Sequence, residues 1–345
     1  MPELPEVEVV RRRLLTCLPG LVVRDVRVHD ATVCDLPEDE LRRTIAGRRV
    51  LGLRRRGKYL MIDLGAVEVQ GKGRDESMAE GKGRNESVVQ RKGRDESRAA
   101  GPPAAAGRLL VVHLRMTGQL LFRPEPRERQ ARFVITFDPS TELHFYDLRR
   151  FGRLWSLDPA DEEAFFAALG PEPFSPDFDV GYLRRALAGR RAPVKAFLLD
   201  QRRIAGVGNI YADEALFRAG LNPLRAAGSV GPREAQRLHA ALLETLQAGI
   251  DHEGSSIESF IDPAGRRGGF QEILNVYQRT GEPCRVCGTA IERVVVGGRG
   301  THYCPRCQPR RGGIAPTARR ARPTGPAGKR DARGAPPATR GAECG

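Results

Sequence analysis

The second and third residues of the chain, Pro2 and Glu3, place an unusual amine beside a carboxyl group. A Met-Pro start is readily trimmed, so we expect Pro2 to carry the free α-amino group, which titrates roughly two to three pH units below a lysine. As a secondary amine it would attack a sugar carbon and form a cationic iminium directly, while Glu3 donates a proton. The alternative is structural, because proline and acidic residues also suit the first turn of a helix.

Four cysteines near the end of the chain give the strongest signal that depends on spacing alone. Cys284 and Cys287 are followed, after sixteen intervening residues, by Cys304 and Cys307. Two such pairs are typical of a tetrahedral zinc site with four thiolate ligands. A site filled by protein ligands leaves no place for a substrate, so the pattern predicts one structural Zn²⁺. The other three cysteines are left as free thiols.

Two turns combine glycine with groups that suit a phosphate. The basic run 54–59 contains Lys58 directly after Gly57, although most such runs are only solvated. The turn 205–209 is glycine-rich and runs into a predicted helix capped by Asn209, so its amide groups are expected to face an anion. Its Gly-x-Gly spacing does not match a dinucleotide site, which leaves a DNA phosphate as the natural anion.

Two further loops place a long or aromatic side chain next to a glycine. Loop 113–118 contains Met116, and loop 147–152 contains Phe151 beside arginines. Apolar side chains flanked by arginines fill the gap left when a nucleotide leaves the DNA stack. The alternative is that both residues are ordinary members of a hydrophobic core.

The charge balance favours a polyanionic partner. The 345-residue chain carries a formal net charge of +14, which indicates nucleic acid before an acidic membrane surface. Residues 308–345 hold nine Lys or Arg against two acidic residues, a composition that predicts a basic disordered tail. Neither an apolar run of about eighteen residues nor a hydrophobic N-terminal segment occurs, so we expect a cytoplasmic, nucleoid-associated protein without a membrane span.

Hydrophobic periodicity predicts the elements that carry these groups. A first helix has Leu4, Val7, Leu14 and Leu18 on one face and is stopped by Pro19-Gly20. Alternation of apolar and polar residues predicts antiparallel strands at 21–28, 49–53, 59–64, 108–114, 116–118, 132–137 and 143–146. Apolar residues at 3.6-residue spacing predict later helices at 180–188, 194–199, 210–218 and 232–250. Residues 253–270 are polar and glycine-rich, as in a mobile loop. A ten-residue repeat within 68–107 has too few apolar residues to fold.

Together these motifs resemble the formamidopyrimidine-DNA glycosylase and endonuclease VIII family, the helix-two-turn-helix DNA repair glycosylases. The resemblance covers nearly all of the chain outside 68–107 and the tail. It is carried by the four-cysteine finger and by Pro-Glu-Leu-Pro-Glu-Val-Glu at 2–8, Gly-Lys-Tyr-Leu at 57–60, Arg-Arg-Phe-Gly at 149–152 and Gly-Val-Gly-Asn-Ile-Tyr-Ala at 206–212. Leu4 is similar to the formamidopyrimidine branch, because endonuclease VIII members usually carry glycine there.

The resemblance implies an α+β, multidomain fold. It would contain an N-terminal antiparallel β-sandwich with a flanking helix, a helix-two-turn-helix domain and a C-terminal zinc-finger β-hairpin. The expected boundaries are 1–158 for the catalytic sandwich with its 68–107 insertion, 159–179 for a linker, 180–279 for the helical DNA-binding domain, 280–308 for the finger and 309–345 for the tail.

The resemblance also implies a bifunctional DNA glycosylase and abasic-site lyase that acts as a monomer on duplex DNA. Its substrates would be oxidised purines, namely 8-oxoguanine and formamidopyrimidines, and abasic sites. Pro2 would attack C1′ of the flipped nucleotide while Glu3 assists sugar opening. The base then leaves, and the iminium acidifies the C2′ proton, so that β- and δ-elimination follow. Residues 255–270 would close over the flipped base.

The same resemblance assigns roles to other residues. Lys58 and Arg299 join the catalytic set, because Lys58 would bind the phosphate next to the lesion and Arg299 a neighbouring one. Met116, Arg149 and Phe151 would occupy the vacated space, with Arg149 facing the orphaned cytosine. The full set of expected DNA contacts outside the catalytic set is Met116, Arg132, Arg149, Arg150, Phe151, Asn209 and Tyr277.

The chain departs from the family pattern at four positions and leaves two rival functions open. Arg115 and Gln278 stand where the family often has glycine, Leu148 where it has proline, and Arg132 where a phosphate-binding histidine is expected. One rival is an endonuclease VIII-like enzyme for oxidised pyrimidines, against which Leu4 argues. The other is a noncatalytic zinc-finger DNA-binding protein, which predicts no chemistry at Pro2.

Overall fold

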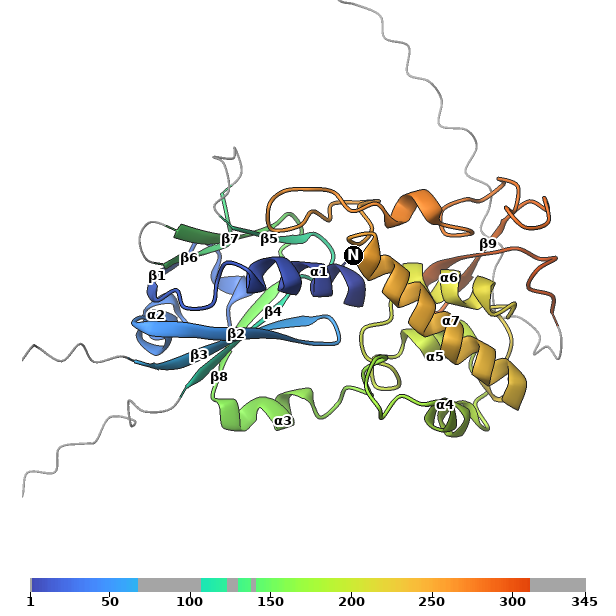
Figure 1. Ribbon diagram of the computed structural model, residues 1–345, viewed down its shortest axis with the longest axis horizontal. Coiled ribbons are helices and arrows are strands. Elements are labelled where there is room, and N and C mark those ends of the chain that lie inside the picture. The colour runs from blue at the N-terminus through green and yellow to red at the C-terminus, as the bar shows by residue number, and fades with distance from the viewer. Residues whose placement is uncertain (1, 68–106, 123–129, 138–140, 311–345) are drawn as a thin grey trace, which may run out of the picture.

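The computed structural model describes residues 2–67, 107–122, 130–137 and 141–310. Figure 1 shows two β-sheets on one side, a group of helices on the other and helix α1 (Leu4–Leu15) between them. The repeat insertion predicted at 68–107, except Gly107, lies outside the described residues, as does the predicted tail after residue 310. Within the described ranges, no helix is both long and apolar enough to cross a membrane.

Two four-stranded antiparallel sheets form the N-terminal half. The first has the order β1 (Val23–Val28), β6 (Phe133–Phe137), β7 (Thr141–Asp147) and β5 (Gly118–Phe122). The second has the order β2 (Arg48–Arg56), β3 (Tyr59–Val67), β4 (Arg108–His113) and β8 (Arg153–Leu157). Helix α2 (Glu38–Ile45) contacts β1. Side chains along the strands alternate between the two faces of each sheet, and the inner faces of both sheets supply residues to one hydrophobic core.

The second half is helical and ends in a hairpin. It contains α4 (Val180–Leu187), α5 (Val194–Leu199), α6 (Asn209–Arg218) and α7 (Pro232–Asp251), with α6 packed along α7. The hairpin pairs β9 (Glu292–Val296) with β10 (Arg299–Tyr303). Short 3₁₀ segments lie at Ala31–Val33, Pro159–Asp161, Ala227–Ser229 and Phe270–Ile273. The predicted α+β class, with antiparallel sheets, helical part and four-cysteine hairpin, is confirmed.

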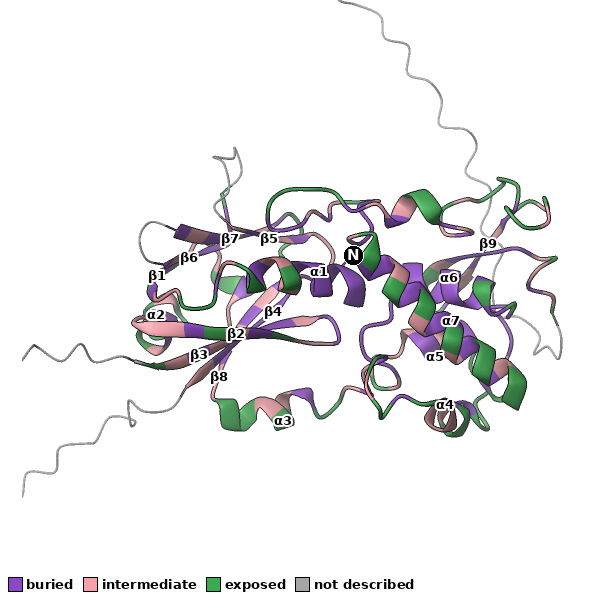
Figure 2. Cartoon of the chain, in the orientation of Figure 1, coloured by how far each residue is buried: buried purple, intermediate pink, exposed green. Residues whose placement is uncertain are grey.

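Helix α1 belongs to both hydrophobic cores. Val7 and Leu14 are fully buried in the sandwich core, whereas Leu4 is fully buried in the helical core beside Tyr211. The first turn of α1 is accordingly buried on all sides, as Figure 2 shows for the ribbon near the N label. A helix held by two cores fixes the residues just before it, which are Pro2 and Glu3.

Several elements differ from the sequence prediction. The strand predicted at 116–118 is wrong for its first two residues and begins only at Gly118, the start of β5, because Arg115 has a left-handed φ of 53° and the Gly118 N–H donates to Leu114 O at 3.0 Å, which closes a turn there. Helix α1 ends at Leu15, before the predicted stop, because the Thr16 hydroxyl bonds back to Arg13 O at 2.8 Å. Helix α2 and strand β8 were not predicted.

The segment predicted as a linker starts with a helix. Helix α3 (Glu162–Phe166) places Phe165 and Phe166 against Tyr59 of the second sheet, with ring centroids 6.1 and 5.4 Å away. Phe166 is buried in a small cluster with Val111. This part of the chain therefore packs on the sandwich before the chain crosses to the helices.

Candidate active site and DNA-binding surface

A cavity of about 300 Å³ opens where α1, the β2–β3 turn, α6, residues 253–270 and the β9–β10 hairpin meet. Residues 253–270 are called loop 253–270 below. Segments far apart in sequence thus share one cavity. Six residues predicted from the sequence line it, namely Glu3, Lys58, Met116, Asn209, Tyr277 and Arg299. Pro2 is buried directly before Glu3, and Met1 lies outside the described residues.

Glu3 is a buried carboxyl group at the bottom of this cavity. Its side chain and backbone are 1% exposed, and its Oε1 accepts from the Ile210 N–H at 3.0 Å. Its own N–H donates to Glu6 Oε2 at 2.7 Å, so the start of α1 is fixed from both sides. Burial raises the pKa of Glu3 to about 7, and the charge of Lys58 opposes that rise. Such a group can give and take a proton at neutral pH.

Lys58 lies in the tight β2–β3 turn after Gly57, whose φ is 57°. This left-handed conformation favours glycine at residue 57. Lys58 is 7% exposed; burial lowers its pKa and the charge of Glu3 raises it. Both buried groups line the same cavity, and each affects the pKa of the other.

The 205–209 turn is built differently from the sequence prediction. Asn209 does not cap α6; Gly208 occupies the N-cap position, and Asn209 is the first helical residue. A Cβ on Gly208 would lie 2.2 Å from Glu3 Cδ, so only glycine lets the carboxyl group reach the helix N-terminus. The Ile210 amide, expected to face a DNA phosphate, takes the carboxylate of Glu3 instead.

The hairpin is held to the helices by a buried ion pair. Lys195 of α5 is fully buried and lies 2.6 Å from Asp213 of α6. Its Nζ also donates to Gly300 O at 3.1 Å and to Thr301 Oγ1 at 2.8 Å. Asn209 Nδ2 donates to the same Gly300 carbonyl at 3.1 Å. These bonds fix the backbone beside Arg299 and aim that exposed side chain into the cavity.

His113 and Tyr277 complete the wall of the cavity. His113 is buried and its Nδ1 accepts from the Arg115 N–H at 2.9 Å. Burial and the charges of Arg115 and Lys58 lower its pKa to about 3, so its ring is neutral at physiological pH. The Tyr277 ring lies 5.1 Å from that of His302, and burial raises the Tyr277 pKa to about 12. Both therefore act as neutral groups.

The loop after β7 projects two apolar side chains. Leu148 is 61% exposed and Phe151 is 53% exposed. The loop is kept in shape by Asp147, whose carboxylate accepts from the Gly152 N–H at 2.6 Å and from the Arg149 N–H at 3.2 Å. The Arg149 guanidinium lies 3.3 Å from Met116 Sδ, so this loop and the cavity edge adjoin.

Two of the expected DNA contacts have partners within the protein. Arg132 donates from Nε to Asp147 O at 2.9 Å and lies 4.0 Å from Asp30, and Arg150 lies 3.4 Å from the same carboxylate. Arg150 also has a left-handed φ of 57°. Arg132, Arg149, Arg150 and Phe151 do not line the cavity among the described residues. Their predicted contacts with DNA remain predictions.

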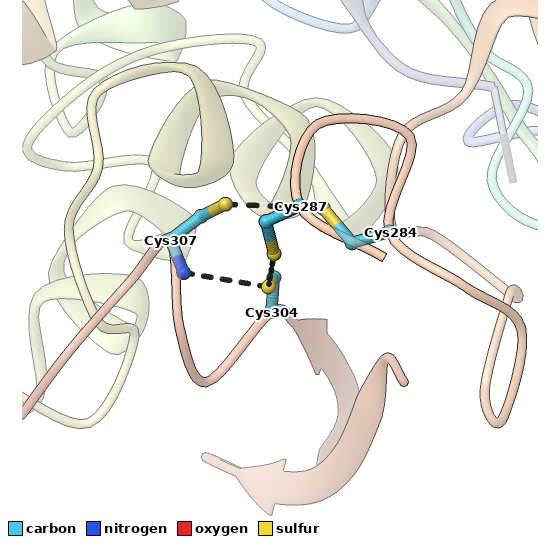
Figure 3. A group of neighbouring side chains, drawn as sticks. All are labelled: Cys284, Cys287, Cys304 and Cys307. Carbon is cyan, nitrogen blue, oxygen red and sulfur yellow. Dashed lines mark hydrogen bonds between the residues drawn. The ribbon is translucent and has the colours of Figure 1, made fainter. Parts of the chain in front are cut away.

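The four predicted cysteine ligands come together at the end of the hairpin. Their sulfur atoms all lie within 4.8 Å of one another (Figure 3). The N–H groups of Val286 and Cys307 donate to Cys284 Sγ and Cys304 Sγ at 3.4 Å each, which stabilises sulfur in its thiolate form. This donor set fits tetrahedral zinc, and its closed geometry makes the ion structural. Cys17 and Cys34 form no disulfide within the described residues and lie half-buried against the sandwich core.

Glu3 is a buried carboxyl group with a pKa near neutrality, and it lies among cations on a protein of high positive charge. This arrangement is typical of an enzyme that acts on nucleic acid. Models of known families match three stretches: the formamidopyrimidine-DNA glycosylase N-terminal domain at 1–154, the H2TH domain of the same enzyme at 169–261, and a zinc finger found in FPG and IleRS at 281–310.

Individual relatives agree with these matches. A formamidopyrimidine-DNA glycosylase of Pelotomaculum thermopropionicum is 40% identical over 89% of this chain and 99% of its own length. A Lactococcus lactis FPG variant, solved with DNA that contains Fapy-dG, superimposes with a TM-score of 0.73 at 30% identity, covering 90% of this chain and all of that one. A MutM structure with DNA that contains carbocyclic 8-oxo-G gives 0.73 at 31% identity, with the same coverage.

The chain therefore belongs to the formamidopyrimidine-DNA glycosylase family. It is a DNA-binding repair enzyme, a DNA glycosylase, and the family zinc finger with its four clustered thiols shows that it binds one structural Zn²⁺.

Sequence reasoning did not predict several residues of the site. His113, Leu199 and Gln201 line the cavity, and Lys195 holds the hairpin. His113 ends strand β4 and precedes the Met116 turn, which was a usable signal. Lys195 gave none, because its partner Asp213 is brought to it only by the packing of α5 on α6.

Proposed function

We propose that this protein is a bifunctional glycosylase and abasic-site lyase that removes oxidised purines from duplex DNA and uses Pro2 as its nucleophile. The observation that carries the proposal is Glu3, a carboxyl group with a pKa of about 7 that lines the cavity directly after Pro2. Similarity to enzymes solved with DNA containing Fapy-dG or 8-oxo-G supports the substrate class.

The chemistry proceeds in two stages. The Pro2 nitrogen forms a bond to C1′ as the glycosidic bond breaks, and protonated Glu3 delivers its proton to the sugar ring oxygen so that the ring opens. The resulting iminium withdraws electrons from C2′, whose proton is lost as the 3′ phosphate leaves. A second elimination releases the 5′ phosphate. Glu3 is suited to this exchange because burial holds its pKa near the working pH.

The remaining site residues bind and bend the duplex. Lys58, Asn209, Tyr277 and Arg299 line the cavity where phosphates flanking a flipped nucleotide would lie. Met116 and Phe151 fill the vacated stack and Arg149 faces the orphaned cytosine. Arg132 and Arg150 steady the Phe151 loop and add positive charge beside the DNA.

Each of the predicted domains contributes a different part of the proposed DNA-binding cavity. We assign the sandwich, 1–158, and the helical domain, 180–279, to opposite walls of the cavity, joined by the 159–179 connection. The finger, 280–308, supplies Arg299 to one edge. We expect the protein to act on DNA as a monomer.

The substrate class is tested by base release from duplexes carrying either 8-oxoguanine opposite cytosine or thymine glycol. We expect free 8-oxoguanine, together with a one-nucleotide gap that bears phosphate at both ends. Release mainly from the thymine glycol duplex would assign the protein to oxidised pyrimidines. Tight binding of both duplexes without release of either base would favour a noncatalytic DNA-binding role.

A further inference from the structure

Loop 253–270 is a long loop whose two ends meet. The Gly269 N–H donates to His252 O at 2.8 Å and the Phe270 N–H donates to Gly254 O at 3.0 Å. Gly254 and Gly265 have left-handed φ values of 81° and 83°, at which the chain changes direction. The loop is therefore closed at its base by backbone hydrogen bonds.

The inner side of this loop forms part of the cavity, and its outer side is attached to the sandwich. Ser255, Ile257 and Phe260 line the cavity. Phe260 is 5% exposed and also belongs to the sandwich core. The Phe122 N–H at the end of β5 donates to Pro263 O at 2.9 Å. Figure 1 shows the loop in orange reaching from α7 over β5.

Arg13 of helix α1 adds a charged contact at two points of the loop. Its Nη2 pairs with the Glu253 carboxylate at the base, and its Nε lies 3.5 Å from Asp262 Oδ2 near the tip. The Asp262 side chain is 2% exposed and shapes the tip, because its Oδ1 accepts from the Ala264 and Arg266 N–H groups at 2.9 Å each. Its Oδ2 also lies 2.7 Å from Arg266 Nη2, so Arg13 is the second cation at this carboxylate and the one that comes from outside the loop. Arg13 thus joins base and tip across the loop.

We propose that Arg13 is a positioning residue that holds loop 253–270 against the sandwich and so keeps the base-binding side of the cavity closed. The inference rests on the proposed function of the cavity. Arg13 lies ten residues along α1 from Glu3, about 15 Å at helical rise, so it does not touch the reacting sugar. The groups expected to act on the sugar, Pro2, Glu3 and Lys58, come from elements outside this loop.

The proposal predicts a split between two reactions of the same enzyme. Base excision needs the loop to enclose the damaged base, whereas elimination at a preformed abasic site involves no base. Arg13→Met keeps the length of the side chain and removes its charge. We expect single-turnover release of 8-oxoguanine to fall about fivefold to tenfold and cleavage of an abasic duplex to stay within about twofold of wild type.

Matched variants separate this role from general effects. Arg12→Met removes a neighbouring charge whose partner is Glu8 of the same helix, at 2.9 Å, and it should leave both reactions unchanged. Arg13→Lys should recover part of the lost base release, because it restores a cation near both carboxylates. Glu253→Gln, which removes the partner of Arg13 at the loop base, should reproduce part of the Arg13→Met defect, and the double variant should be no worse than Arg13→Met alone.

Each outcome decides the matter. Equal loss of both reactions would mean that Arg13 supports the fold or DNA binding, and unchanged base release would mean that the ion pairs do not position the loop; either result overturns the proposal. A wild-type enzyme that cleaves abasic DNA but releases no base would count against the proposed glycosylase function instead, so the two failures are distinguishable.

Discussion

Replacement of Gly208 by alanine should inactivate the enzyme without unfolding it. An added Cβ would lie 2.2 Å from Glu3 Cδ and 2.5 Å from each carboxylate oxygen, where ordinary contacts begin near 3.4 Å. The carboxyl group must therefore move by about 1 Å, and a displacement of that size costs on the order of a hundredfold in rate. The backbone at residue 208 is extended, at φ −131°, so alanine itself fits there without strain.

The expected loss of stability is similar in size to this loss in rate, because a hundredfold in rate corresponds to about 2.7 kcal/mol. It is nevertheless well below the roughly 5 to 15 kcal/mol that keeps a domain folded. The carboxyl group is the end of a flexible side chain, and what is lost is its hydrogen bond with the Ile210 N–H, about 1.5 to 3 kcal/mol for a bond to a charged group. Single-turnover base release and chemical denaturation would measure the two effects. Gly52→Ala is the control, because no atom lies within 4 Å of its added Cβ. Base release by Gly208→Ala within threefold of wild type would refute the reasoning.

Four further predictions concern pH, the buried ion pair, zinc and salt. Burial raises the pKa of Glu3 to about 7, so the folded state binds an extra proton and its free energy of unfolding decreases as pH rises from about 4.5 to 7. In Glu3→Gln the difference in unfolding free energy between pH 5 and pH 8, measured by denaturation, should be smaller. Lys195→Met removes the cation beside Asp213 Oδ1 and leaves this buried carboxylate only its contacts with His302, so it should cost about 3 to 5 kcal/mol of unfolding free energy, most of it recovered by adding Asp213→Asn. Removal of zinc by a chelator should unfold the β9–β10 hairpin, detected by proteolysis, and weaken DNA binding. Arg299→Met should reduce the slope of log affinity against log salt by about 0.9 if it contacts one phosphate.

Local patterns were sufficient to predict much of this molecule. Helices α4 and α7 have buried residues on one face at helical spacing, and the cysteine ligands are close in sequence within each pair. Spacing alone therefore predicted the helices and the zinc site. Pro2, Glu3 and Lys58 were predicted as site residues from their local sequence context. Pro2 and Glu3 place an amine beside a carboxyl group at the start of the chain, and Lys58 follows a turn glycine in a basic run.

The properties that make the site reactive could not be predicted in this way. Burial against α6, some 200 residues further along the chain, raises the pKa of Glu3, and the charge of Lys58 in a different turn opposes that rise. Asn209 was expected to cap helix α6, but the Glu3 carboxylate reaches the start of that helix instead. No local sequence pattern connects Glu3 with this helix. These features arise from tertiary packing.

Two departures from the family pattern also needed the structure. Arg115 and Gln278, which stand where the resemblance led us to expect glycine, have left-handed φ values of 53° and 57°. Such a conformation costs a residue with a Cβ roughly 1 to 2 kcal/mol. The backbone at both positions thus has a conformation that glycine would favour, and Arg115 brings an additional cation to the cavity wall.

The central claim is that the N-terminal amine of Pro2 performs the chemistry. Its most direct test is borohydride trapping of untagged protein on a duplex with 8-oxoguanine opposite cytosine, followed by mass mapping of the adduct and a Pro2→Gly control. The account predicts DNA attached to the peptide that begins at Pro2, and no such proline adduct in the control. An adduct on a lysine such as Lys58, or base release without any trapped species, would contradict it.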